Sequence, residues 1–164
     1  MSTGTNSINQ DMLGKLNTLS TVTTVDVTGS TLTATQAAHS NRVVTLSRAA
    51  GVTVTLPAAA GTGDRYTFVT KTAVTSNSNI VKVANGTDVM DLSLAIWQDS
   101  TTGAGTAKIY VSTAGDDTVT LNGGTTGGLA GCMVECIDYA SGFWRVTVTG
   151  KTVGIVATPF SATV

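Results

Sequence analysis

The chain has 164 residues, a net charge of −1, 41% hydrophobic residues and only 12% charged residues. This length fits one domain with one core, and the sparse charge argues against a basic surface of the kind that binds nucleic acid. Threonine and glycine are abundant, which is typical of β-strands separated by turns and not of a helical enzyme. We find no apolar run long enough to cross a membrane and no apolar signal-peptide core, so we expect synthesis in a cytoplasm without export.

The first residues in chain order predict a short N-terminal arm, either helical or extended. Apolar residues recur there at helical spacing: Ile8, Met12, Leu16 and Leu19. A helix this short needs a surface to cover, which is either its own β-domain or a partner or sister subunit. We therefore divide the chain into an arm, residues 1–28, and a single β-rich domain, residues 29–164.

Further along the chain, short stretches of alternating hydrophobic and polar residues predict strands, with glycine, asparagine and aspartate between them. The expected strands are Thr21–Thr28, Ser30–Thr35, Arg42–Ser47, Val52–Leu56, Arg65–Lys71, Ile80–Ala84, Val89–Trp97, Lys108–Thr113, Thr118–Leu121, Cys132–Asp138, Phe143–Thr149 and Gly154–Thr158. Many short strands at even spacing predict an all-β fold, which we expect to be an antiparallel sandwich of jelly-roll-like form or a short barrel.

One β-unit is repeated in the sequence. Ala50–Thr70 reads as a strand, a turn rich in small residues and a second strand, and the same order returns over Ala114–Ile137. In the first copy, alternation places Val52, Val54 and Leu56 on one side of the first strand and Tyr66 and Phe68 on one face of the second. Two similar corners are thus expected to build the scaffold.

Residues able to carry chemistry are scarce, so we expect no enzyme, no cofactor and no metal. The one histidine, His39, is expected in a turn with local hydrogen bonds. Cys132 and Cys136 would lie about 13 Å apart on a strand, too far for a disulfide unless the segment is bent, so we expect buried free thiols. The acidic pair Asp116 and Asp117 has too few oxygens for calcium without added carbonyls.

The two tryptophans fall in different patterns. Trp144 shares a strand face with Val146 and is expected in the core. Trp97 falls on the face of Ser93 and Ala95, the small and polar side of its strand. An aromatic residue in that place is a candidate contact residue, and the alternative is that it covers a sheet edge.

Three stretches resemble structural proteins of tailed bacteriophages: Val52–Val69, Ile80–Met90 and the closing Ala157–Val164. They are similar to small phage proteins that decorate, or cement, the outside of the head. The resemblance implies a β-rich protein that binds the major capsid protein after the shell expands, commonly as a homotrimer at local three-fold positions. It does not extend to the N-terminal arm.

We therefore expect a capsid decoration protein, made in the host cytoplasm and located on the exterior of the virion capsid, with no membrane or nucleic-acid partner. The alternative is a phage fibre or tail-associated protein that binds a receptor or glycan, which Trp97 and the Thr- and Asn-rich loops suggest. A glycan-degrading enzyme would need two carboxylates across a cleft, and the chain has a single glutamate. The candidate capsid or subunit contacts are Ile8, Met12, Leu16, Leu19, Trp97, Pro159 and Phe160.

Overall fold

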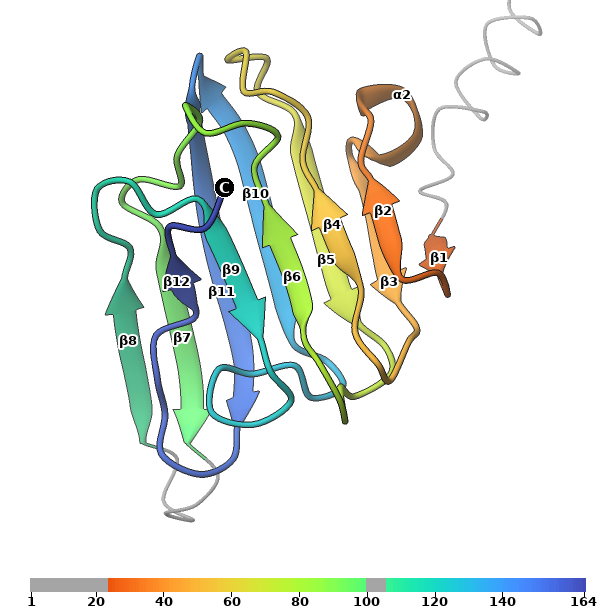
Figure 1. Cartoon of the computed structure of the whole chain (residues 1–164), viewed down its shortest axis with the longest axis vertical. Helices are drawn as coiled ribbons and strands as arrows, with labels where there is room; N and C mark the ends of the chain where they lie inside the picture. The colour runs from red at the N-terminus through yellow and green to blue at the C-terminus, as the bar shows by residue number, and fades with distance from the viewer. Residues whose placement is uncertain (1–23, 100–105) are drawn as a thin grey trace, which may run out of the picture.

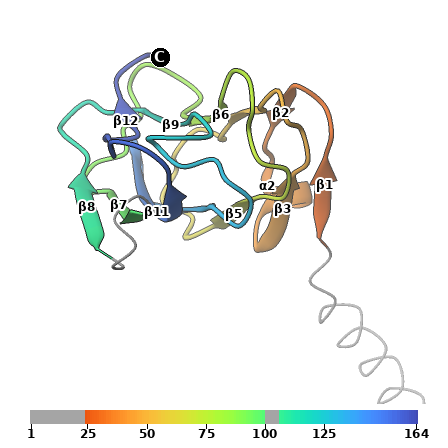
Figure 2. The same ribbon diagram turned by 90° about the horizontal axis from the view of Figure 1, so that it is seen from below.

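The computed structural model describes residues 24–99 and 106–164, which form two β-sheets packed face to face (Figures 1 and 2). The seven-stranded first sheet has the order β1 (Val25–Val27), β3 (Arg42–Leu46), β5 (Arg65–Thr70), β10 (Met133–Ala140), β11 (Phe143–Thr152), β7 (Leu94–Asp99) and β8 (Ala107–Val111). The five-stranded second sheet has the order β12 (Phe160–Ser161), β9 (Thr118–Leu121), β6 (Asn79–Lys82), β4 (Thr53–Thr55) and β2 (Thr31–Thr33). A single turn of helix, α2 (Gln36–His39), joins β2 to β3.

The predicted all-β sandwich is confirmed, but its sheets are mixed and not purely antiparallel. From β1 to β6 the chain alternates between the two sheets, so β1, β3 and β5 run parallel in the first sheet and β2, β4 and β6 run parallel in the second. Between two neighbouring strands of one sheet, the chain forms one strand of the other sheet. The next strand of the first sheet therefore runs in the same direction as the previous one, which explains the parallel pairs. Among the described residues the sheets do not close into a barrel.

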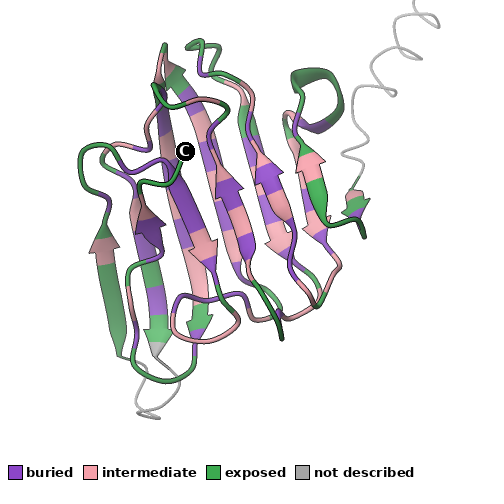
Figure 3. Cartoon of the chain, in the orientation of Figure 1, coloured by how far each residue is buried: buried purple, intermediate pink, exposed green. Residues whose placement is uncertain are grey.

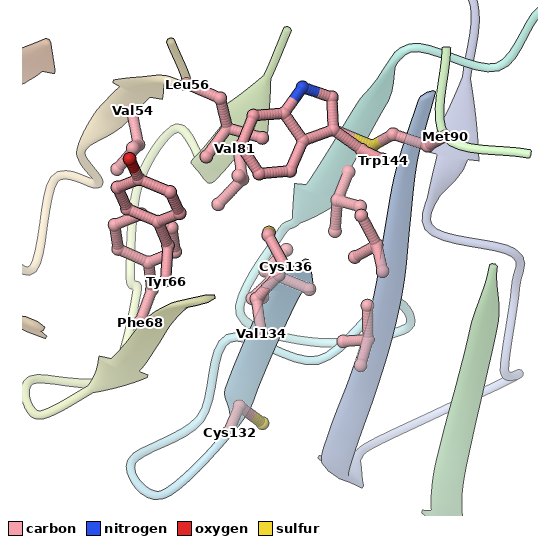
Figure 4. Packing of buried hydrophobic residues seen from close by; sticks show 14 of the residues in the cluster. Val54, Leu56, Tyr66, Phe68, Val81, Met90, Cys132, Val134, Cys136 and Trp144 are labelled. Carbon is pink, nitrogen blue, oxygen red and sulfur yellow. The ribbon is translucent and has the colours of Figure 1, made fainter. Parts of the chain in front are cut away.

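The core lies between the sheets and is built from the inward side of every long strand. Burial alternates along β5, β10 and β11 (Figure 3), as expected for strands with one face on a core. Tyr66 and Trp144 meet edge to face with ring centroids 5.7 Å apart, close to Val54 and Val81 of the opposite sheet (Figure 4). Trp144 is thus a core residue, as predicted.

Both cysteines are free and buried, as predicted. Cys136 lies in the inward row of β10, and Cys132 is buried just before the strand begins. Burial raises the pKa of the Cys136 thiol well above its usual range. We therefore expect this thiol to be inert in the folded protein.

The two copies of the repeated unit lie together at the centre of the molecule. In each copy the chain crosses from the second sheet to the first, from β4 to β5 and from β9 to β10. β5 and β10 pair antiparallel, with Phe68 opposite Val134, and β4 and β9 lie on the two sides of β6. The expected pair of corners is therefore present, and the two corners run in opposite directions.

Four local predictions need correction or comment. The predicted strand Gly154–Thr158 is not formed, because the tail pairs with β9 only at β12. The predicted turn around His39 is the helix α2, although His39 makes the expected local bond: the Thr35 N–H donates to its Nδ1 at 3.0 Å. β7 begins at Leu94 and not at Val89. β1 lies within residues 1–28, so the end of that range pairs with the first sheet.

Candidate functional site

The residues predicted as contacts fall into two groups in the structure. The arm residues Ile8, Met12, Leu16 and Leu19 lie outside the described residues. The other three, Trp97, Pro159 and Phe160, are buried within the domain.

Trp97, the candidate contact residue on β7, is fully buried, because the small residues of this strand face inward. Ser93 and Ala95 are buried together with Trp97, whereas Ile96 faces outward. The Ser93 hydroxyl accepts a hydrogen bond from the Val146 backbone N–H at 2.8 Å, so this polar side chain is satisfied inside the protein. The indole lies over Gly127, and the missing side chain at this position leaves room for the ring.

Pro159 and Phe160 belong to the domain's own core and not to its surface. β12 pairs with β9, with Phe160 opposite the buried Val119. The prediction that these two residues contact a partner therefore has no support from their position. The carboxylate of Asp117 holds the chain that follows them by accepting hydrogen bonds from the backbone N–H groups of Thr163 and Val164 at 2.8 and 3.0 Å.

The surface most suited to a partner is the outer face of the first sheet, which the sequence did not reveal. Strand register aligns its outward side chains in two rows across β3, β5, β10, β11, β7 and β8. The rows are Thr45, Val69, Met133, Thr149, Ile96 and Ile109, and Val43, Thr67, Glu135, Thr147, Leu94 and Val111. All twelve residues are half-buried or exposed, and Glu135 is the only charged one among them. A broad apolar and hydroxyl-bearing surface of this kind is typical of a protein interface.

A hollow of about 380 Å³ lies at one end of this outer face. It is lined by Asp91, Leu92, Ile137, Tyr139 and Arg145. Tyr139 also packs on Phe143, with ring centroids 6.1 Å apart, and both rings are exposed. Tyrosine and arginine around an apolar hollow are the residue types that dominate binding energy in protein interfaces.

Leu92 in this hollow has an unusual backbone conformation. Its φ is +49° although it is not glycine, and its side chain is 62% exposed. The Asp91 carboxylate accepts a hydrogen bond from the Leu92 N–H at 2.8 Å and so supports the turn. Positive φ costs a bulky residue free energy, and an exposed side chain contributes little to the stability of its own domain. Leu92 in this conformation therefore favours a role in contact with a partner.

The outer face of the second sheet has a different character. Its outward residues are mostly threonines: Thr31, Thr33, Thr53, Thr55 and Thr120, with Ile80 and Lys82 on β6. This face is more polar than the outer face of the first sheet. It therefore offers a control surface for binding experiments.

The carboxylates with shifted pKa values serve the fold. Burial raises the pKa of the Asp138 carboxyl, but hydrogen bonds from the backbone N–H groups of Gly61, Ala60 and Thr62 lower it more, so the net shift is downward. These bonds fasten the turn between β4 and β5 to β10. Burial raises the pKa of Tyr66 to about 12.

Within residues 24–99 and 106–164, no group of three or more His, Cys, Asp or Glu side chains could hold a metal ion. No helix in this part of the chain is long and apolar enough to cross a membrane. No family model, curated protein or solved structure matches this chain.

Proposed function

We propose that this protein is a bacteriophage capsid decoration protein that binds the exterior of the assembled shell through the outer face of its first sheet. The proposed partner is the major capsid protein, and the proposed binding form is a homotrimer at local three-fold positions. The sequence resemblance suggests this class of protein. The observation that carries the binding surface is the outer face itself, with its two apolar and hydroxyl-bearing rows and the hollow around Leu92 at one end of the face.

A protein of this kind stabilises a shell by mass action. It binds the closed lattice and not the loose subunits, so each bound copy lowers the free energy of the closed state. Contacts repeated over the lattice add up even when each one is weak. A rigid sandwich with one open apolar face fits this task, because the face is formed before binding and little ordering is needed.

The alternative function, a fibre or tail-associated protein that binds a receptor or glycan, has lost its main support. Trp97 suggested it, and a fully buried indole cannot stack on a sugar ring. The exposed aromatic pair Tyr139 and Phe143 lies beside the hollow and fits the protein-binding surface equally well.

The test is co-sedimentation of the purified protein with expanded capsid shells of the phage whose genome encodes it. We expect wild-type protein to pellet with shells, and Leu92→Asn to bind about tenfold more weakly because it removes an apolar contact at the hollow. Asparagine tolerates positive φ, so the stability of this variant should be unchanged or higher.

The matched control is Ile80→Thr, a half-buried position on the outer face of the second sheet, which should bind like wild type. Failure of wild-type protein to pellet with shells would refute the proposed function. Equal losses for both variants would refute the assignment of the binding face.

A further inference from the structure

β8 is the last of the described strands in the first sheet, and none of the others pairs with its outer edge (Figure 1). It pairs with β7 over Leu94↔Val111 to Gln98↔Ala107 without a register shift, and no other described strand pairs with it. Four of its five residues are exposed, including Ile109 at 63% and Val111 at 53%. Natural sheets usually protect such an edge with a proline, a bulge or charged side chains, because an open edge can pair with another chain. β8 has no proline and no bulge, and Lys108 is its one charged residue.

The backbone groups at this edge are set by the pairing with β7. The Ser112 N–H donates to the Ser93 carbonyl at 3.0 Å, which makes this pair a hydrogen-bonded one. Hydrogen-bonded and non-hydrogen-bonded pairs alternate along an antiparallel ladder. The N–H and C=O groups of Tyr110 and Lys108 therefore point toward β7, and those of Ala107, Ile109 and Val111 point away from the sheet.

We propose that β8 pairs antiparallel with β8 of a second copy of this chain, across a two-fold axis centred on Ile109. Ile109 then lies opposite Ile109 of the second copy, and Val111 lies opposite Ala107. The contact joins the two first sheets edge to edge and extends the outer-face row that contains Ile109 from one copy to the other.

Among the registers that antiparallel pairing allows, this one gives a partner to the largest number of β8 residues. Only residues with outward backbone groups can form the hydrogen-bonded pairs, so a register shifts in steps of two residues. If Ala107 lies opposite Ile109, only the three residues from Ala107 to Ile109 pair, and Lys108 lies opposite Lys108 of the second copy, which is a repulsive pair. The opposite shift also pairs only three residues, Ile109 to Val111.

In the proposed register all five residues pair, and Lys108 lies opposite Tyr110. The Tyr110 hydroxyl donates to the Val156 carbonyl at 2.7 Å, which holds that side chain against its own domain. The proposed register therefore pairs the whole strand and avoids the repulsive Lys108 pair.

The contact goes beyond the proposed function and does not depend on it. Five paired residues cover less than the roughly 1,200 Å² that a stable dimer buries, so the pair should be weak in dilute solution. If copies form trimers on a shell, a two-fold contact of this kind joins copies from different trimers.

The test uses single cysteines at two neighbouring outward positions of the full-length protein. Directly opposed residues of a hydrogen-bonded pair have Cα atoms about 5.5 Å apart, within reach of a disulfide. Mild oxidation of concentrated Ile109→Cys should therefore give a disulfide-linked dimer on a non-reducing gel. Cys132 and Cys136 are buried, so the wild-type protein oxidised in the same way measures any dimer that these native cysteines form.

The matched control is Val111→Cys, which has a similar exposure. In the proposed register the two copies of residue 111 are four residues out of alignment, about 13 Å apart, and should not link. The double variant Ala107→Cys with Val111→Cys should link again, because these positions face each other.

The proposal is overturned if Ile109→Cys fails to link while its circular dichroism spectrum matches wild type. It is also overturned if Val111→Cys links as fast as Ile109→Cys, which would indicate random collision or another register. Both outcomes leave shell binding through the outer face unaffected, so the two proposals fail independently.

Discussion

Trp97 shows how single residues set the packing of this protein. Its six-membered ring lies so close to Gly127 that a Cβ atom at position 127 would be 2.6 Å from two ring carbons. Gly127 also has a φ of +80°, which side chains rarely adopt. The missing side chain at Gly127 therefore leaves the space that the indole fills.

We predict that Gly127→Ala lowers the free energy of unfolding by about 3 kcal/mol, from backbone strain plus overpacking against the indole. The matched control is Gly115→Ala, where φ is +90° and no atom lies within 4 Å of the added Cβ. That variant should lose only about 1 kcal/mol, from strain alone. Urea unfolding curves measure both values, and equal losses would contradict the role of the Trp97 contact.

At the scale of elements, the C-terminal strand depends on one carboxylate. β12 has only two residues, and the chain beyond it is held by Asp117, which accepts hydrogen bonds from Thr163 and Val164. Burial raises the pKa of the Asp117 carboxyl, but the hydrogen bonds from Thr163, Thr118 and Val164 lower it more, so its pKa lies below the usual value.

A carboxylate with a lowered pKa in the folded state stabilises the protein above its usual pKa, near 3.8, and this contribution is lost as the pH falls through the folded-state value. We therefore predict that Asp117→Asn loosens the C-terminal tail at neutral pH and weakens the acid dependence of unfolding. Carboxypeptidase digestion at neutral pH measures the tail, and we expect faster release of residues 162–164.

The neighbouring variant Asp116→Asn is the control, because the Asp116 carboxylate bonds to Thr113 and not to the tail. Its tail should stay protected. Equal release from both variants would mean that Asp117 does not anchor the tail.

At the scale of the whole molecule, the two sheets depend on each other. Because β1 to β6 alternate between the sheets, neither sheet can complete its pairing while the other is absent. One core connects them, from Leu46 of the first sheet to Val81 and Leu121 of the second. The described domain should therefore unfold as a single unit.

We predict one cooperative unfolding transition, with the same midpoint in far-ultraviolet circular dichroism and in tryptophan fluorescence. The variant Trp97→Phe leaves one reporter on β11, and Trp144→Phe leaves one on β7. Each should report the same transition as the circular dichroism of the same variant. Refolding should take milliseconds to seconds, because most strand pairs join distant segments. Separate midpoints for the two reporters would show that the sandwich unfolds in parts.

The sequence by itself determined where most strands lie and which residues share a strand face. Alternation grouped Val54 with Leu56 and Tyr66 with Phe68, all of which are buried in the structure, and the spacing of the cysteines predicted free thiols. These features are local, because a strand buried on one face has a period of two whatever its partner is.

Only the tertiary structure decided how strands pair and which surface is open. The period of two is the same for parallel and antiparallel neighbours, so the alternation of β1 to β6 between sheets left no trace in the pattern. β10 carries apolar residues on both faces, with Val134 inward and Ile137 outward. Hydrophobicity could not show which side meets solvent, just as it misplaced Trp97, because burial depends on the neighbours that the fold brings to each face.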